Sequence, residues 1–289
     1  LDGLAVAPPC DLLDADLVHA DETTIQVLKE PGKKAQTKSY LWAQATGSGP
    51  PIRLFGYARG RGATHAETLY AGIKRGAALM SDGYEVYGGV AEANGLTHLA
   101  CWAHCRRYFV EAEAVIPKAA RSPEQIATQF IAAIAELYAV EARARDLTPE
   151  QRHALRQEHS RPILVKIEAM LLKHLHAVVP GSLLGKALHY LSAQWPKLIR
   201  YVENGAWPID NNLCENAIRP FVVGRRNWLF ADTVAGAHAS ANLYSIIETC
   251  KANSIDPYAY LVSLFRKLPA AQTVDDFERL LPWRLANAD

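Results

Sequence analysis

Short runs of hydrophobic residues, separated by turn-forming residues, occupy the first hundred positions of the chain and predict β-strands there. Runs rich in β-branched and aromatic residues lie at Leu17–Asp21, Tyr40–Thr46 and Ile52–Ala58. Glycine, serine and proline separate the second run from the third and indicate an antiparallel connection. Two more apolar runs, Ala77–Asp82 and Thr97–Trp102, predict a fourth and a fifth strand. The first three runs are therefore expected to form a meander within a larger sheet.

Apolar residues at helical spacing lie between and after the later runs. Thr64–Ile73 and the segment Ala103–Phe109 are predicted as helices, and Ala91–Gly95 as a helical turn. The predicted order is three strands, a helix, a strand, a helix, and a strand that leads into the next helix. Such an order predicts an α/β domain that combines an antiparallel meander with a parallel edge.

The composition changes between residues 121 and 205, where alanine, leucine, glutamate and arginine replace the strand-forming residues. Ser122–Gln125 and Thr148–Gln151 have the pattern of capping boxes with proline at the first helical position, which predicts two helix starts. Apolar residues at helical spacing from Ile126 to Tyr138 predict one buried stripe. We therefore expect an all-helical insertion that folds semi-independently of the sheet.

These boundaries predict how the chain is organised. A linker precedes the core domain, the insertion interrupts it, and two helices at residues 239–252 and 257–268 follow it. The expected segments are the linker at 1–16, the first part of the core at 17–120, the insertion at 121–205, the second part of the core at 206–235 and a C-terminal helical segment at 236–289.

The segment 208–230 sets one acidic residue, Glu215, among amides, arginines and a tryptophan. Asp210 is a candidate N-cap for a helical run over residues 211–219. Pro220 is expected to end that run, because proline cannot continue the backbone hydrogen bonding of a helix. The sequence therefore predicts a short helix that presents Glu215.

Glu215 shares one face of this predicted helix with polar neighbours. Asn211 and Asn212 precede it by one turn, and Arg219 follows it by one turn. A carboxylate beside amides and a guanidinium suits a metal ion and a phosphate backbone. The alternative is that Glu215 and Arg219 form an ordinary exposed ion pair.

Two further carboxylates end predicted strands. Asp21 ends the first strand, and Asp82 ends the fourth, where Gly83 follows it. Each residue alone is more simply explained as a turn-forming aspartate. Together with Glu215, however, they form an ordered set of carboxylates, the ligand type that Mg²⁺ prefers. A pair of such ions roughly 3.5–4 Å apart can activate the attacking oxygen and stabilise the leaving oxygen in phosphodiester chemistry.

Composition limits the possible functions. The 289 residues are 49% hydrophobic, enough to bury one large core or two smaller ones. The net charge of +1 does not indicate a generally basic nucleic-acid binder, so any contact with DNA must rest on local patches. One basic window runs from Arg53 to Arg75 and contains Glu67 as its only acidic residue.

The cysteines and the lengths of the apolar runs indicate the expected cellular compartment, and the first residue indicates whether the parent protein is longer. The five cysteines are odd in number and widely scattered, which argues against a disulfide framework and indicates a reducing compartment, the cytoplasm. No apolar run approaches the roughly 18–20 residues that a membrane span requires, so no membrane association is expected. Because the chain begins at Leu1 rather than at methionine, we expect a longer parent protein.

Five stretches of the chain are similar to one protein family. They are HADET around Asp21, SDGY around Asp82, CWAHCRR from Cys101, DNNLCENAIRPFVVGRRNWLF from Asp210 and ANLYSIIETCKANSIDPYAYL from Ala241. With these stretches the chain resembles the insertion-sequence sixty-six family of bacterial DDE transposases over nearly its whole length. The stretch that begins at Asp210 is the most specific of the five.

The resemblance implies a fold and a set of catalytic residues. The implied fold is α/β and ribonuclease H-like: a mixed five-stranded sheet flanked by helices, with the helical insertion before the catalytic Glu helix. Asp21, Asp82 and Glu215 take the three catalytic, metal-binding positions. The implied cofactor is Mg²⁺, with two ions expected and Mn²⁺ able to substitute.

The resemblance also implies partners. These are DNA, both as transposon ends and as target, a homo-oligomer formed on DNA, and accessory proteins of the same element. Full-length members carry N-terminal helix-turn-helix and zinc-binding segments that this sequence does not contain. Recognition of the element ends is therefore not expected from these residues.

Cys101, His104 and Cys105 have the spacing C-x-x-H-C, which suggests a zinc site. Zinc is the weaker interpretation, because a closed structural site needs four ligands and the sequence shows no second cluster. The resemblance places His104 beside the catalytic centre, where it would bind a phosphate or a carboxylate. The alternative is a structural histidine.

Basic and aromatic residues near the three acids in sequence are candidates for nucleic-acid binding. Arginine suits phosphate oxygens because its planar fork offers parallel N–H donors, although many arginines are only solvated charges. The indole of Trp228 is expected in the core, with stacking on an unpaired base as the alternative. The candidate nucleic-acid-binding residues are His104, Arg106, Arg107, Arg219, Arg225, Arg226 and Trp228.

The motifs and the resemblance together favour a metal-dependent transposase core, which cleaves a phosphodiester at an element end and directs the exposed 3′-OH onto target DNA. Two alternatives stay open. A ribonuclease H-like nuclease or junction resolvase would use the same metals without strand transfer. A domesticated, non-catalytic DNA-binding protein would need no intact set of three carboxylates, so that set weighs against it.

Overall fold

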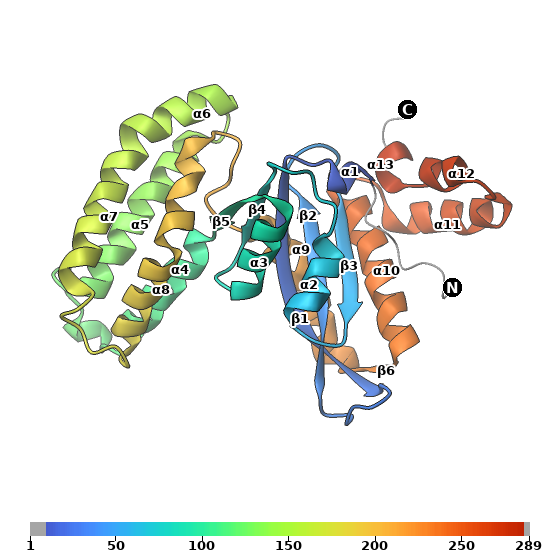
Figure 1. The fold of residues 1–289 in the computed structure, drawn as a ribbon, viewed down its shortest axis with the longest axis horizontal. Coiled ribbons are helices and arrows are strands. Elements are labelled where there is room, and N and C mark those ends of the chain that lie inside the picture. The colour runs from blue at the N-terminus through green and yellow to red at the C-terminus, as the bar shows by residue number, and fades with distance from the viewer. Residues whose placement is uncertain (1–9, 286–289) are drawn as a thin grey trace. The chain divides into compact units, whose positions relative to one another are not determined.

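A mixed β-sheet flanked by helices forms the centre of the fold (Figure 1). The computed structural model describes residues 10–285. Within that range the strand order is β3-β2-β1-β4-β5, and a short sixth strand, β6, pairs with β1 off this path. The mixed five-stranded sheet of a ribonuclease H-like α/β fold is thereby confirmed. The strands are β1 (Leu17–Lys29), β2 (Lys38–Thr46), β3 (Arg53–Ala58), β4 (Ala78–Ser81), β5 (Thr97–Ala100) and β6 (Ala231–Thr233).

Helices account for most of the remaining described chain. Those before the predicted Glu helix are α1 (Cys10–Leu13), α2 (Ala63–Tyr70), α3 (Glu85–Asn94), α4 (Trp102–Ala114), α5 (Ile126–Arg143), α6 (Pro149–Leu155), α7 (Arg161–His174) and α8 (Leu183–Leu198). The others are α9 (Asn212–Trp228), α10 (Val234–Ala252), α11 (Pro257–Lys267), α12 (Val274–Arg279) and α13 (Pro282–Leu285). Short turns of other helix types are η1 (Lys118–Ala120), η2 (Arg156–Ser160), η3 (Ile199–Glu203) and η4 (Leu268–Ala270). None of the helices formed by residues 10–285 combines the length and the apolar character needed to cross a membrane.

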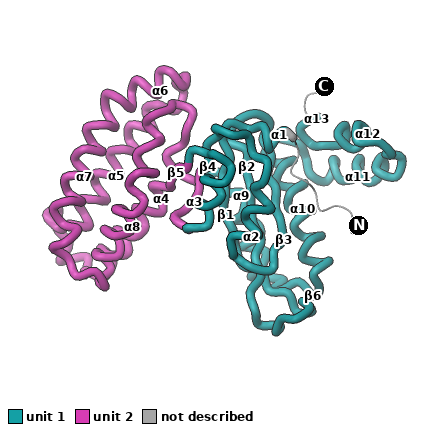
Figure 2. Tube along the Cα trace, viewed as in Figure 1, with its two compact units in different colours: residues 1–79, 85–97, 212–289 teal, residues 80–84, 98–211 magenta. Residues whose placement is uncertain are grey.

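The chain divides into two compact units (Figure 2). The first unit contains the chain up to Leu79, the segment Glu85–Thr97 and the chain from Asn212 onward. The second unit contains Met80–Tyr84 and His98–Asn211. The second unit is therefore larger than the helical insertion predicted at residues 121–205.

Strands β1, β2 and β3 form the predicted antiparallel meander in the first unit. Thr23 of β1 pairs with Leu41 of β2, and Leu41 pairs with Tyr57 of β3. Buried residues alternate along the second half of β1, where Ile25 and Val27 join the core. Because this alternation continues, the strand extends to Lys29. Asp21 therefore lies inside the strand rather than at its predicted end.

Helix α10 packs along the edge strand β3 (Figure 1). The Ser245 hydroxyl of α10 accepts the N–H of Phe55 at 2.8 Å, and the Thr249 hydroxyl accepts the N–H of Arg53 at 3.0 Å. These two side chains supply the partners that a neighbouring strand would otherwise provide. Helix α10 therefore protects this sheet edge from pairing with another chain.

The core of the second unit joins helix α4 to the helices of the predicted insertion. The Phe109 ring of α4 stacks on Phe130 of α5, with the ring centroids 4.5 Å apart. Trp102 of α4 and Leu188 of α8 are fully buried in the same cluster. Residues before position 121 thus belong to the core around which the insertion packs.

One of the two predicted helix starts is wrong and the other is confirmed. Thr148 forms a capping box with Gln151 at the start of α6. Ser122 instead bonds to Glu124 in a separate turn, and helix α5 begins at Ile126. The apolar stripe of α5 begins only there, so packing starts the helix later than the capping pattern suggests.

A buried arginine ties the helices of the second unit together. Arg156, at the start of the π-helical turn η2, is fully buried and donates two hydrogen bonds to Glu141, at 2.8 and 2.6 Å. It also donates to the carbonyl oxygens of Tyr201 and Asn204, at 2.7 and 2.8 Å. A buried charge is tolerated only when it is paired and hydrogen-bonded in this way.

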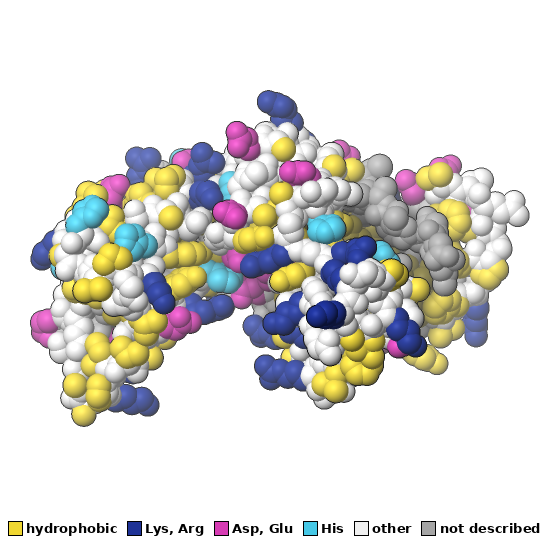
Figure 3. Space-filling model, turned by 60° about the horizontal axis from the view of Figure 1, so that its bottom comes forward, with side chains coloured by type: hydrophobic (Ala, Val, Ile, Leu, Met, Phe, Trp, Pro, Cys, Tyr) yellow, Lys and Arg dark blue, Asp and Glu magenta, His cyan; other side chains and the backbone are white. Residues whose placement is uncertain are grey.

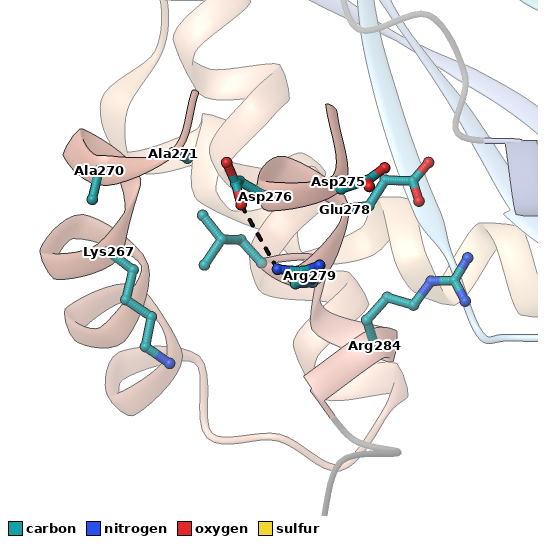
Figure 4. Close-up of a pocket in the computed structure, with 9 residues that line it drawn as sticks. Lys267, Ala270, Ala271, Asp275, Asp276, Glu278, Arg279 and Arg284 are labelled. Carbon is teal, nitrogen blue, oxygen red and sulfur yellow. Dashed lines mark ion pairs between the residues drawn. The ribbon is translucent and has the colours of Figure 1, made fainter. Parts of the chain in front are cut away.

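The last helices of the chain enclose a pocket of about 720 Å³ (Figure 4). The Arg279 guanidinium lies 3.8 Å from the Asp276 carboxylate across part of it. None of the three predicted catalytic acids lines the pocket. The lining residues are Lys267, Ala270, Ala271, Asp275, Asp276, Glu278, Arg279, Leu280 and Arg284.

Candidate active site

Helix α9 carries Glu215 in its first turn and packs against strands β1 and β2. One stripe of the helix is apolar and buried in the core of the first unit, because its members recur at helical spacing. The stripe comprises Cys214, Ala217, Ile218 and Phe221. Burial of this stripe sets the rotation of the helix about its axis and therefore the direction of the half-buried Glu215.

The helix begins at Asn212 and continues past Pro220 to Trp228, so the predicted end at Pro220 is wrong. Proline inside a helix removes a backbone hydrogen bond and costs about 3 kcal/mol or more. The apolar stripe nevertheless continues across it. Phe221 is fully buried, and the Trp228 ring packs edge-on against it with centroids 5.1 Å apart. Packing against the sheet outweighs the local preference of proline.

Asp21 lies on β1 opposite Ala43 of β2. The Cys214 thiol of α9 reaches the same place, because it donates to the Ala43 carbonyl oxygen at 3.7 Å. Burial raises the pKa of the Cys214 thiol well above its ordinary value. The negative charges of Asp21, Glu215 and Glu22 raise this pKa further. The first unit therefore places the buried, neutral Cys214 thiol, which precedes Glu215 on α9, against the residue that pairs with Asp21.

Glu22 follows Asp21 and was not singled out from the sequence. Its side chain is only 3% exposed and accepts a hydrogen bond from Nε of Arg61 at 2.6 Å. The Tyr87 hydroxyl donates to the same carboxylate. Arg61 lies in the basic window of the sequence. That window was the sequence signal that Arg61 could have a buried acidic partner. Glu22 is thus fixed by a guanidinium and a phenol within the first unit.

Asp82 follows strand β4 directly, as predicted, and lies in the second unit. Its Oδ1 accepts the N–H of Tyr84 at 2.9 Å, which closes a tight turn over Gly83. Ser81, which is fully buried, donates its hydroxyl proton to the Asp82 carbonyl oxygen at 2.9 Å. The same hydroxyl oxygen lies 2.8 Å from Nε2 of His98 on β5.

These contacts define the tautomer of His98. Ser81 has a single hydroxyl proton, which it gives to Asp82, so the proton between Ser81 and His98 must come from Nε2. Nδ1 of His98 is then an acceptor, buried and without a hydrogen-bond partner among the described residues. Burial lowers the pKa of His98 to about 3, and the charges of Lys197 and Arg200 contribute. Neutral His98 holds Ser81, and Ser81 holds the backbone of Asp82.

The C-x-x-H-C element leads into α4. Cys101 and Cys105 are fully buried, and His104 is half-buried. Cys101 Sγ accepts the N–H of Asn211 at 3.3 Å. Burial raises the pKa of the Cys105 thiol well above its ordinary value. The Cys105 side chain is therefore a buried, neutral thiol, and the weaker standing of the zinc interpretation stays a prediction.

Arg225 and Arg226 share the last turn of α9 but have different surroundings. Nη1 of Arg225 donates to the Thr23 hydroxyl at 3.1 Å and to the Thr24 hydroxyl at 2.9 Å. It also donates to the Thr24 carbonyl oxygen. Arg226 is exposed. Arg225 therefore ties α9 to strand β1, whereas Arg226 lies at the surface.

The other candidate arginines are also at the surface. Arg106 and Arg107 of α4 and Arg219 of α9 are exposed. Lys and Arg side chains gather over the first unit on the face shown in Figure 3. Trp228 is partly buried and packs against the core of the first unit, and its contact with a base stays a prediction. Leu229, with φ of 65°, is the exposed residue beside it that the sequence did not single out.

Comparison with known families identifies the chain. The family model for the transposase IS66 family matches residues 6–239, and the model for the IS66 C-terminal element matches residues 245–283. The chain belongs to the IS66 transposase family. This is the insertion-sequence sixty-six family that the five sequence motifs resemble, so that recognition is confirmed.

Two curated relatives of this IS66 transposase family member come from Sinorhizobium fredii (strain NBRC 101917 / NGR234). Uncharacterized protein y4qI is 32% identical over 283 residues, covering 93% of this chain and 51% of the relative. Uncharacterized protein y4jD is 31% identical over 279 residues, covering 92% of this chain and 53% of the relative. The chain thus spans about half the length of the curated relatives it matches.

The stability of this IS66 family member should depend on pH through His98. The pKa of His98 is about 3 in the folded chain, against an ordinary 6.5. Between these two pKa values His98 is protonated in the unfolded chain but not in the folded chain. The contribution of His98 to the free energy of unfolding is therefore greatest above pH 6.5 and decreases as the pH drops toward 3. From pH 7 to pH 5 the loss due to His98 should be about 2 kcal/mol.

Urea unfolding of the wild type and of His98→Gln, at both pH values, measures this loss of unfolding free energy. Glutamine carries an amide donor in place of Nε2–H but does not titrate. The variant should therefore lose less stability than the wild type on acidification. An equal loss in both proteins would contradict a buried, neutral His98.

The two arginines at the end of α9 should affect DNA binding differently. Removing one arginine that binds a phosphate of duplex DNA flattens the plot of log affinity against log salt by about 0.9 unit. We expect this change for Arg226→Ala, because that side chain is exposed. Arg225→Ala should leave the slope unchanged and lower stability by about 1.5–3 kcal/mol, since it removes charged hydrogen bonds to β1.

Fluorescence anisotropy with a short duplex over a range of KCl concentrations gives the slope, and urea unfolding gives the stability. Each variant serves as the control for the other. A wild-type slope for Arg226→Ala would mean that this arginine is only a surface charge. A flattened slope for Arg225→Ala would contradict its internal role.

Proposed function

We propose that this chain is the catalytic core of a DDE transposase, which cleaves phosphodiesters at transposon ends and transfers the strand into target DNA. Family membership supports a transposase role. The observation that carries the catalytic assignment is the hydrogen bond from the Cys214 thiol to the Ala43 carbonyl oxygen, which brings the helix that carries Glu215 to the residue paired with Asp21. Asp82 supplies the third acidic residue, after the strand that neighbours β1 in the sheet order.

The donor chemistry of these residues fits a hard divalent cation. Asp21, Asp82 and Glu215 offer carboxylate oxygens, whereas the thiol of Cys214 is neutral and offers no soft ligand. Oxygen donors of this kind select Mg²⁺ or Mn²⁺ over zinc. Two such ions, when bound, would activate the attacking oxygen and stabilise the leaving oxygen.

The chain's own residues would orient the DNA for two similar displacement steps. Exposed arginines such as Arg107 and Arg226 would hold phosphate oxygens by paired N–H donors. In cleavage, a water oxygen bonds to phosphorus while the bond to the 3′-oxygen breaks, which yields a 3′-OH and a 5′-phosphate. In strand transfer, that 3′-OH attacks a target phosphodiester in the same way. Neither step requires a covalent bond between protein and DNA.

The remaining partners belong to the whole transposase. We propose DNA ends and target DNA as substrates, a homo-oligomer on DNA, and accessory proteins of the same element. The relatives are about twice as long as the matched segment, so segments outside it can recognise the ends. Free thiols at Cys101, Cys105, Cys214 and Cys250 favour a reducing compartment, and we propose the cytoplasm.

Asp82→Asn tests the catalytic assignment. The amide keeps the size of the side chain but loses the negative charge that a hard cation requires. We expect Mn²⁺ binding, followed by electron paramagnetic resonance, to weaken, and metal-dependent nicking of supercoiled plasmid to be lost. Asp146→Asn, at an exposed aspartate of the same unit, is the matched control and should behave as the wild type.

The outcomes separate the candidate functions. Wild-type nicking by Asp82→Asn would contradict the assignment of this residue. Nicking by the wild type without joined products, when DNA with a free 3′-OH is supplied, would favour a nuclease or resolvase. Metal-independent DNA binding with no nicking by the wild type would favour a non-catalytic binding protein.

A further inference from the structure

Helix α8 of the second unit places Tyr190 against the turn that follows Asp82. A Cβ atom added to Gly83 would lie 2.6 Å from Cε2 of Tyr190 and 2.9 Å from its hydroxyl oxygen. Only glycine leaves room for the ring at this distance. Tyr108 of α4 stacks on the Tyr190 ring, with centroids 4.5 Å apart and an interplanar angle of 28°. Tyr190 is therefore fixed beside the turn by contacts from two elements.

The hydroxyl of Tyr190 has no use in the folding of the second unit. Its oxygen is buried and lacks a hydrogen-bond partner among residues 10–285. An unpaired buried polar group costs about 1–3 kcal/mol, and phenylalanine would fill the same space without that cost. Burial raises the pKa of the hydroxyl well above its ordinary value, and Cys105 and Asp82 add to the shift, so it stays a proton donor. An unpaired donor beside the turn that follows Asp82 requires a functional explanation.

We propose that Tyr190 is a positioning residue of the metal site, which donates its hydroxyl proton to the Asp82 carboxylate when that carboxylate binds a cation. This inference rests on the proposed role of Asp82. Carboxylates that bind metals are themselves hydrogen-bonded, and loss of such a partner typically lowers metal affinity or activity by roughly 10–100-fold. The helical insertion would then contribute a side chain to catalysis through α8.

Tyr190→Phe tests the inference because it removes only the hydroxyl. We expect the Kd for Mn²⁺, measured without DNA, to rise roughly tenfold. The Tm of the metal-free protein should stay the same or rise, since an unsatisfied group has been removed. Tyr108→Phe is the matched control: it makes the same change on the stacked ring, which is 37% exposed, and should alter neither value.

Asp82→Asn serves as the reference that separates this inference from the proposed function. If Asp82→Asn weakens Mn²⁺ binding and Tyr190→Phe does not, Tyr190 has no positioning role and the proposed function stands. If neither variant changes Mn²⁺ binding, Asp82 is not a ligand and both proposals fail. A lower Tm for Tyr190→Phe, or an equal effect of Tyr108→Phe on Mn²⁺, would show a packing role and overturn the inference.

Discussion

The packing of helix α9 against strands β1 and β2 determines where the acidic residues of the first unit meet. Its buried stripe overrides the proline within the helix and points Cys214 at the β2 backbone opposite Asp21. The same contact sets the direction of Glu215, one residue further along the helix. Arg225, near the other end of α9, is bonded to β1, the strand that carries Asp21, so the two ends of the helix are held to two neighbouring strands.

The second unit fixes its acidic residue by a different arrangement. Neutral His98 holds Ser81, and Ser81 holds the backbone of Asp82, so the start of the turn is set from within the core. Tyr190 of the helical insertion then limits the next position to glycine. The insertion thus contacts the Asp82 turn through Tyr190, and the core of the insertion includes residues of helix α4. The Asp82 carboxylate is oriented by the turn as well, because its Oδ1 accepts the Tyr84 N–H.

The sequence predicted the order of the elements and the family well, because strand alternation, helical spacing and motif letters are local features. The predictions were wrong where tertiary packing determines where a strand or helix begins or ends. Asp21 lies inside a strand because alternation resumes beyond it, and Pro220 lies inside a helix because buried residues flank it. Ser122 has a capping pattern but no apolar stripe beside it, so the helix starts later. A contact between distant segments, such as that of Tyr190 with the Gly83 turn, leaves no local signal in the sequence.

The proposed function requires that the carboxylates of Asp21, Asp82 and Glu215 bind the same catalytic cations. Anomalous diffraction from crystals of the chain soaked in Mn²⁺ tests this most directly, because it locates the ions without reference to activity. We expect Mn²⁺ bound by the carboxylates of these three residues, with two ions at the spacing of about 3.5–4 Å that phosphodiester chemistry uses. Mn²⁺ bound elsewhere, with none of the three carboxylates among its ligands, would contradict it.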